Sequence, residues 1–309
     1  MANFLDVENL TYCGKEANEI FAKQVYSLDL RSYGITLMDG VKGKVKLYTG
    51  EIGDVWQKYT CPFTPKGEAS LAEDYMEPEA IKVNMEQCYD AFWNTFLVEQ
   101  TSITLNGGIP QTFSEWFFNV KLLPKMAKEY QEMFWQGDKD SDVEHLSVVD
   151  GVEKILAADG EKITGSTITT ANVLSQIEAV VNKGVELAAA EDLDMEDYKI
   201  FMNYNDIRLA KMALGTDSPL TTQVWANWAK EGDKIYAYGF EVVPTMQSRS
   251  KIIFGPARNL VLGFDTFDSH QEYRILDMKE HTGDNMFRVI ALSNIAVGVV
   301  LAELFVISE

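Results

Sequence analysis

The chain has 309 residues and a formal net charge of −20 at pH 7, from 27 basic and 47 acidic side chains. Hydrophobic residues make up 46% of it and charged residues 24%, which is typical of a folded globular protein and excludes a largely disordered one. The acidic balance also argues against a nucleic-acid-binding protein, because such binding relies on Lys and Arg displacing counterions from phosphates.

Cysteine usage and the N-terminal residues indicate a protein that is not secreted. Cys13, Cys61 and Cys88 are too few and too scattered for a disulfide framework, which indicates a reducing compartment. The first ten residues have neither the basic start nor the apolar core of a signal peptide. Residues 289–307 are long and apolar, but Glu303 inside them would be costly in a bilayer. A buried strand or strand pair is therefore expected there.

The first part of the chain predicts an arm followed by a strand. Residues 1–43 are expected to be extended around one helix over residues 16–30, where apolar side chains recur at helical spacing. Residues 44–49 alternate apolar and polar side chains, which predicts a half-exposed strand.

The segment over residues 50–78 contains prolines and too few apolar residues for a core of its own. A long excursion of this kind inside a compact domain usually has a function. Its aromatic side chains need a surface to bury against, which is either their own domain or another subunit. The candidate intersubunit contacts are Trp56, Tyr59, Phe63 and Tyr75.

The next two elements predicted are a strand and a helix. Residues 80–85 predict a return strand, and the apolar residues from Met85 to Phe96 follow at helical spacing. Residues 138–165, further along, are acidic and are expected to be rich in loops.

A long helix is predicted between these two regions, over residues 112–136. Thr112 and Glu115 have the spacing of a capping box, which marks a helix start. One apolar stripe continues from there to a stop at Gly137, with a kink or restart expected at Pro124. Such a stripe predicts a helix that packs in the core.

Alternating helices and strands are predicted beyond residue 165. A short helix is expected to end at Gly184, followed by a strand over residues 198–202. Asn205 is expected to cap a helix over 205–215, and residues 216–233 to form a surface segment. Three apolar strand regions then complete the chain, over residues 238–246, 251–265 and 284–307.

The sequence contains no strong catalytic motif. His145, His270 and His281 form neither an H-x-x-x-H nor an H-E-x-x-H pair, and no glycine motif for phosphate or dinucleotide binding and no G-x-S-x-G is found. Ser248 and Lys251 match the pattern S-x-x-K, but the partner motif K-T-G is missing and four-residue matches are common by chance.

Two acidic patterns are equally weak. The residues from Asp138 begin like a calcium loop, but Val143 and Val149 stand where the loop needs Gly and Glu. Asp265 and Asp268 would act as a carboxylate pair only if the fold brought them together. We therefore expect no catalytic residue, no metal site and no cofactor.

The order of these elements and the last strands resemble the major capsid proteins of tailed phages, the Hong Kong 97-type shell fold that encapsulins share. The strongest resemblance lies in Gly-Phe-Glu-Val-Val-Pro over 239–244 and Leu-Val-Leu-Gly-Phe-Asp over 260–265. The resemblance implies an α+β fold. Its implied parts are an N-terminal arm (1–43), an extended β-hairpin or E-loop (44–85), a peripheral domain (86–197) with a spine helix (about 112–136), an axial domain (198–265) and a return to the peripheral domain (266–309).

The function implied by the resemblance is structural and not enzymatic. A major capsid protein self-assembles into hexamers and pentamers of an icosahedral phage head, which encloses double-stranded DNA without binding it specifically. The acidic charge suits such a wall, although alone it favours an ordinary acidic soluble protein. Implied partners are further copies of the chain, a portal and head-completion proteins. The implied location is the virion, after assembly in the host cytoplasm and with no membrane.

The sequence also departs from some members of this family. Met1 leads straight into the arm, so a separate scaffolding protein is implied where one is used. Lys58 and Lys66 lie in the hairpin, but nothing singles out an Asn partner, so no isopeptide cross-link is expected. Two alternatives remain open: an encapsulin-type compartment, and an α+β enzyme with an unrecognised site.

Overall fold

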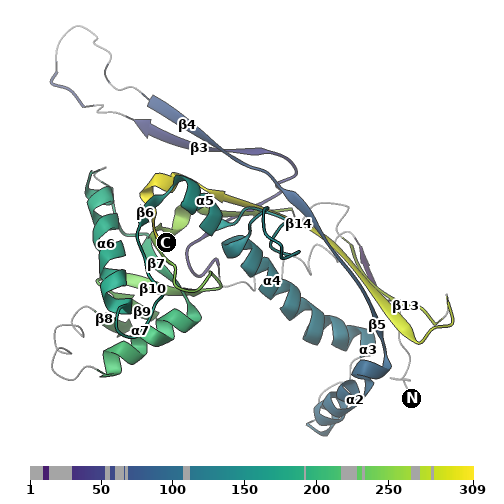
Figure 1. Ribbon diagram of the computed structural model, residues 1–309. Helices are drawn as coiled ribbons and strands as arrows, with labels where there is room; N and C mark the ends of the chain where they lie inside the picture. Colours follow the sequence, from purple (N-terminus) through teal and green to yellow (C-terminus); the bar gives the residue numbers. More distant parts are fainter. Residues whose placement is uncertain are drawn as a thin grey trace.

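The protein has a mixed α+β fold with two large sheets and a projecting hairpin (Figure 1). The computed structural model describes residues 10–13, 30–52, 56–59, 66, 69–106, 112–190, 193–216, 228–231, 234–265, 272–279 and 282–309. A seven-stranded sheet with its helices occupies one end of the body, and a six-stranded sheet runs through the remainder. The helix expected over residues 16–30 lies outside the described residues.

The six-stranded sheet is built around one long strand, β14 (Met286–Val299). On one side β5 (Glu79–Cys88) runs antiparallel to it over almost its whole length. Apart from β5, the order of strands across the sheet is β1 (Leu10–Cys13), β13 (Glu272–Asp277), β14, β12 (Leu260–Phe264) and β2 (Thr36–Asp39). The sheet thus joins segments from both ends of the chain.

A row of helices packs against this sheet through aromatic side chains. The helices are α2 (Asp90–Leu105), α3 (Phe113–Trp116), the π-helical turn η1 (Phe117–Leu122) and α4 (Leu123–Gln136). Phe287 of β14 meets Phe117 with ring centroids 4.8 Å apart and Phe113 with centroids 5.5 Å apart. The predicted core stripe is therefore confirmed.

The helix start and the restart at proline also follow from the sequence. Thr112 accepts a hydrogen bond from the Glu115 amide while the Glu115 carboxylate accepts one from the Thr112 amide, so the capping box is confirmed. Pro124 has no N–H and its ring would clash with the carbonyl of Val120 in a regular helix. The wider π-helical turn before α4 relieves this conflict.

The seven-stranded sheet is mixed and is covered by helices on both faces. Its order is β6 (Glu161–Ile163), β15 (Val306–Ser308), β11 (Ile252–Pro256), β7 (Tyr198–Asn203), β10 (Phe240–Thr245), β9 (Lys234–Ala237) and β8 (Trp228–Glu231). The helices are α5 (Val152–Asp159), α6 (Val173–Ala190) and α7 (Tyr204–Thr216).

Strand alternation divides this sheet between two cores. Ile200 and Met202 of β7 pack with α6 and α7, whereas Phe201 between them joins the core that reaches α4. Val242 and Val243 of β10 divide in the same way. Successive side chains of a strand point to opposite faces of a sheet. One face of the seven-stranded sheet therefore packs with α6 and α7, and the other contributes to the core that includes α4 and the six-stranded sheet.

Several predicted elements have different limits in the structure. The region 251–265 is two strands, because a 3-10 turn at Ala257–Asn259 follows Pro256 and carries the chain from one sheet to the other. The last region contains two separate strands, β14 and β15, which belong to different sheets.

Other local predictions were wrong in detail. Met85 and Cys88 belong to β5 and not to a helix, because the pairing with β14 continues as far as Cys88. The loop expected over 138–165 contains α5 and β6. Trp228 starts β8, so the surface segment over 216–233 is partly a strand. The helix after β7 begins at Tyr204, one residue before the predicted cap.

Gly184 lies inside α6 and does not end it. A Cβ atom there would lie 2.2 Å from Cδ1 of the fully buried Phe254 ring, so the glycine permits a close approach of helix and sheet. We expect Gly184→Ala to destabilise the protein by about 1–3 kcal/mol, because overpacking outweighs the roughly 1 kcal/mol that alanine gains in helix propensity. Urea unfolding would measure the change.

Gly43→Ala is the matched control for this substitution. An added Cβ at Gly43 meets no atom within 4 Å, so its effect on the free energy of unfolding should stay within about 0.5 kcal/mol. A Gly184→Ala protein as stable as the Gly43→Ala protein would contradict the packing argument.

Candidate assembly surfaces

The hairpin of β3 (Val45–Ile52) and β4 (Ala69–Met76) projects from the body and is anchored only at its base (Figure 1). Met76 and Leu47 are buried there against Val261 and Ala296 of the six-stranded sheet. A Cβ atom on Gly298 would lie 2.8 Å from Cδ1 of Leu47, so this glycine lets the hairpin base approach β14 closely. The base is fixed while the far end reaches away from the body.

The four aromatic candidates lie in different parts of this hairpin. Trp56 is 90% exposed and Tyr59 is 89% exposed, beyond the paired strands. Tyr75 lies near the base, where Nζ of Lys44 is 4.6 Å from its ring centroid. Phe63 lies outside the described residues. Trp56 and Tyr59 are thus almost fully exposed, and their role between subunits stays a prediction.

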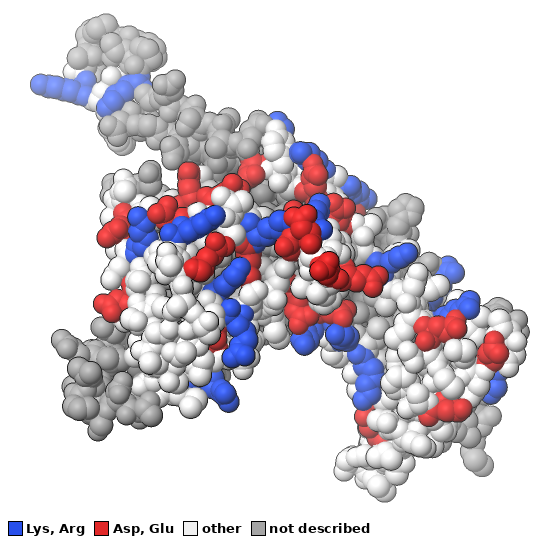
Figure 2. Space-filling model, in the orientation of Figure 1, with Lys and Arg blue, Asp and Glu red and all other residues white. Residues whose placement is uncertain are grey.

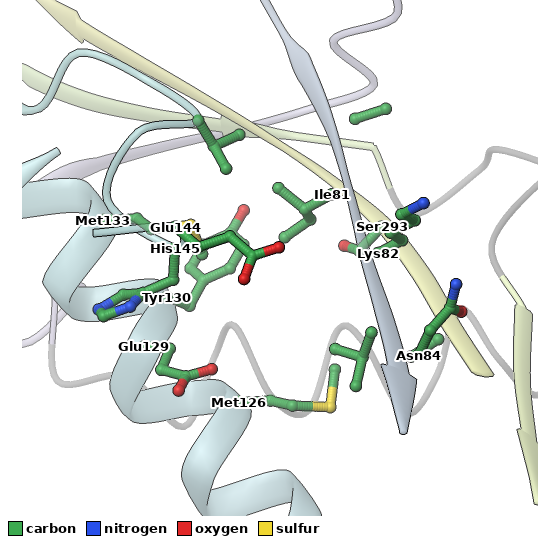
Figure 3. Close-up of a pocket in the computed structure, with 14 residues that line it drawn as sticks. Ile81, Lys82, Asn84, Met126, Glu129, Tyr130, Met133, Glu144, His145 and Ser293 are labelled. Carbon is green, nitrogen blue, oxygen red and sulfur yellow. The ribbon is translucent and has the colours of Figure 1, made fainter. Parts of the chain in front are cut away.

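A groove of about 600 Å³ lies between α4 and β5 (Figure 3). Its floor is apolar and is made by Met126, Tyr130 and Met133 of α4 facing strand residues such as Ile81. The Tyr130 hydroxyl donates to the carbonyl of Asn294 at 3.0 Å. Burial raises the pKa of Tyr130 well above its ordinary value, so this phenol stays protonated and acts as a structural hydrogen-bond donor.

The groove does not bring a nucleophile and a base together. Its serine, Ser293, has a buried hydroxyl oxygen without a hydrogen-bond partner. His145 lies at the α4 side, with Nε2 3.4 Å from a carboxylate oxygen of Glu132. Since nucleophilic catalysis needs such a pair within hydrogen-bond reach, this arrangement offers none. His270 and His281 lie outside the described residues.

Ser248 and Lys251, which match S-x-x-K, have structural roles. The Ser248 amide donates to the buried Glu153 carboxylate, and Nζ of Lys251 lies 3.2 Å from the other carboxylate oxygen. Gln247, in the same loop, donates to the carbonyls of Phe201 at 3.1 Å and Lys251 at 2.6 Å. This polar network ties the loop after β10 to α5 and β7.

The segment that resembles a calcium loop is occupied by a lysine. Nζ of Lys154 lies 2.6 Å from Asp138, 2.7 Å from Asp140 and 3.0 Å from Asp150. The hydrogen bond from Lys154 lowers the pKa of Asp138 below its ordinary value, and the same bond raises the pKa of Lys154. The cluster is therefore an ion-pair network centred on Lys154.

This network predicts a pH-dependent stability. The pKa of Asp138 is lower in the folded state than in the unfolded state. The ionised carboxylate therefore contributes fully to the free energy of unfolding above the unfolded-state pKa, and this contribution is lost as the pH falls through the folded-state pKa. Lys154→Met should lower the urea midpoint at about pH 7, and the two proteins should converge at about pH 2. The exposed Lys211→Met serves as control and should show no such convergence. A constant difference at every pH would contradict the assignment.

Asp265 and Asp268 cannot be compared as a pair, because Asp268 lies outside the described residues. Asp265 is fully buried and has Lys42 Nζ 3.8 Å from its carboxylate. Among the described residues no group of three or more His, Cys, Asp or Glu side chains is arranged to hold a metal ion. In that same part of the chain, no helix combines the length and apolar character needed to cross a membrane.

The surface charges are mixed, and one surface carries almost none. On the face shown in Figure 2, acidic and basic side chains are interspersed over the described part of the body. The projection that carries α2 is an exception, since it is largely white. This surface was not predicted, although the sequence carries a signal for it: between Asp90 and Glu115 the only charged residue is Glu99.

The architecture defines a subunit with a projecting hairpin and no assembled reaction centre among the described residues. No protein-family model matches the chain, and no curated protein matches it. Solved structures do resemble it. One is the satellite phage P4 procapsid including size determination (Sid) protein, at 13% identity and a TM-score of 0.59, covering 94% of this chain and 98% of the other.

Two further structures give the same result. The capsid of Myoviridae phage XM1 matches at 10% identity and a TM-score of 0.55, with 91% of each chain covered. The capsid of the native GTA particle computed with C5 symmetry matches at 11% identity and a TM-score of 0.53, covering 91% of this chain and 89% of the other. The chain therefore has the fold of chains that build phage capsids.

Proposed function

We propose that this protein is the major capsid protein of a tailed phage and has no enzymatic activity. The observation that carries the proposal is the extent of the likeness to the P4 procapsid, which covers 94% of this chain and 98% of the other chain. A likeness that takes in both chains almost completely supports the same structural role for the whole of this chain.

The shell is proposed to be icosahedral and to consist of hexamers and pentamers of this chain. In this proposal the fold is of the Hong Kong 97 type. The hairpin over residues 44–85 is the E-loop, residues 86–197 form the peripheral domain with the spine helix over about 112–136, and residues 198–265 form the axial domain before the chain returns to the peripheral domain. The first 43 residues act as the N-terminal arm. The exposed Trp56 and Tyr59 at the hairpin support a contact with a neighbouring subunit.

The proposed partners follow from the same role. Copies of the chain bind one another, and a portal, head-completion proteins and a separate scaffolding protein complete the head. The shell is assembled in the host cytoplasm, becomes part of the virion and encloses double-stranded DNA without specific binding. The net charge of −20 supports this last point, because an acidic wall does not hold the phosphate backbone.

Electron microscopy of the expressed protein, with a scaffolding protein from the same source where needed, tests the proposal. Closed shells or rings of five and six subunits are the expected result. Particles from the native source should contain double-stranded DNA and no stoichiometric enzyme. An enriched protein cargo would favour an encapsulin-type compartment, whereas a monomer with hydrolytic activity would favour the enzyme alternative.

A further inference from the structure

Helix α2 has one packed side and one bare side. It projects from the body beside α3 and the end of β5 (Figure 1). On the inner side, the ring centroid of Phe92 lies 5.2 Å from that of Phe117, and the ring centroid of Phe96 lies 5.4 Å from that of Phe113. On the outer side Val98 is 70% exposed and Leu105 is 82% exposed. An outer face with large exposed apolar side chains marks a surface for contact with another molecule.

The outer face of α2 is also free of charge. Glu99, the only charged residue between Asp90 and Glu115, is turned toward Trp116 and Lys121, with its side chain still 36% exposed. Its carboxylate accepts a hydrogen bond from Nε1 of Trp116 and lies 3.2 Å from Nζ of Lys121. The other exposed residues of the helix after Asp90 are small or uncharged, namely Ala91, Asn94, Thr95, Leu97, Thr101, Ser102 and Thr104.

Two hydroxyl groups on this helix are satisfied within it. Oγ1 of Thr101 donates to the carbonyl of Leu97 at 2.8 Å, and Oγ1 of Thr104 donates to the carbonyl of Gln100 at 2.9 Å. Burying a hydroxyl is costly only when its hydrogen bonds are lost. Both donors keep their partners when water leaves, so covering these two hydroxyl groups costs little.

The lack of charge indicates which kind of molecule covers the face. Two copies of a chain with net charge −20 repel each other, and a contact between surfaces without acidic groups adds least to this repulsion. The centres of protein interfaces are depleted of charged residues in the same way. A helix that binds a membrane surface carries Lys or Arg on its polar face, and α2 has neither.

We propose that the outer face of α2 packs against the same face of α2 in a second copy of this chain. The contact rests on the proposed function, because it is one of the contacts between copies in the shell, and it is separate from the hairpin contact. A like-to-like contact is symmetric, so residues at its centre meet their own counterparts. Val98 and Thr101 lie midway along the face, and each is expected close to the same residue of the other copy.

Cross-linking tests the geometry. In a background with the three cysteines replaced by serine and with assembly verified, Val98→Cys treated with a short bis-maleimide should give covalent dimers within the assembled particles. Val143→Cys is the matched control, since Val143 is also an exposed valine, at 46%, but lies in a loop away from α2. Assembled particles in which Val98→Cys gives no more dimer than Val143→Cys would overturn the proposal.

Charge reversal tests the energetics. The double variant Val98→Glu with Leu105→Glu should lower the yield of assembled particles about tenfold or more, because it buries like charges between copies. Its urea midpoint should not change, since both side chains are exposed. Mixing Val98→Glu protein with Val98→Lys protein should restore assembly. Wild-type yield from the double variant would overturn the proposal.

These outcomes separate the inference from the proposed function. If shells form normally but Val98→Cys gives no cross-link, the proposed capsid function stands and the proposed α2 contact is contradicted. If the wild-type protein forms no shell while the Val98→Cys variant still gives cross-linked dimers in solution, the α2 contact is retained and the capsid role is contradicted.

Discussion

Replacing Trp56 and Tyr59 together with serine is expected to abolish shell assembly and to leave folding unchanged. Both side chains are almost fully exposed on the isolated chain, at 90% and 89%, so their removal should change the free energy of unfolding by no more than about 0.5 kcal/mol. Buried aromatic anchors contribute about 2 kcal/mol or more to an interface. Each contact between subunits would lose two such anchors, and the loss recurs throughout a shell.

Electron microscopy and urea unfolding of the same preparation measure the two effects. Tyr204→Ser is the control, because Tyr204 is an exposed aromatic residue, at 48%, on α7 and outside the hairpin. A normal yield of shells from the double variant would show that Trp56 and Tyr59 are not needed for assembly.

Point substitutions test the hairpin better than a deletion. Removing residues 54–76 would remove all of β4, and with it Met76, which is only 1% exposed at the hairpin base. Such a deletion would open the small core that Met76 shares with Leu47 and Val261. A failure to assemble could then come from damage to the subunit itself.

Features that depend on residues close together in the chain were predicted best from the sequence. The capping box of Thr112 and Glu115 is confirmed because both of its hydrogen bonds join groups three residues apart. The apolar stripe over the long helix is confirmed for the same reason, since helical spacing concerns near neighbours in the chain. The α+β class and the likeness to phage capsid chains follow from the order of such local elements.

Pairings between distant segments were not visible in the sequence. β5 continues to Cys88 because β14, about two hundred residues later, offers a partner as far as Met286. The period-two pattern of Ile81, Val83 and Met85 was present, but the apolar residues after Met85 also fitted a helix. In such short stretches tertiary pairing decides between strand and helix.

The two places where the chain changes sheet differ in how well they could be predicted. Pro256 has no N–H, so it cannot donate a ladder hydrogen bond there and favours the end of β11. The change after β14 occurs at Leu301, which has a φ of 51° without being a glycine. A left-handed leucine gives no sequence signal, since only the surrounding packing imposes that conformation.

The candidate surfaces show the same limit. Aromatic residues without a core of their own pointed to the hairpin, and its exposed position agrees with that argument. The proposed cover of Trp56 belongs to a second copy, which a single sequence does not describe. The bare face of α2 required the structure, because the sequence does not tell that Glu99 faces Trp116 while Val98 faces outward.

Val243→Asp is expected to prevent folding, and therefore every later step of assembly. Val243 is 1% exposed on β10, on the sheet face that joins the core shared with α4. An aspartate there places an unpaired carboxylate among apolar side chains and removes a buried valine. The combined cost should exceed about 4 kcal/mol, which is a large part of the roughly 5–15 kcal/mol that stabilises a domain.

The control separates burial from charge. Val143→Asp makes the same chemical change in a loop where the side chain is 46% exposed, so its effect should stay within about 0.5 kcal/mol. Soluble yield, circular dichroism and urea unfolding would show a folded Val143→Asp protein and an unfolded or aggregated Val243→Asp protein. If Val243→Asp instead folds with a normal midpoint and enters shells, the face of β10 that carries Val243 is not buried, and the continuous core between the two sheets described above is incorrect.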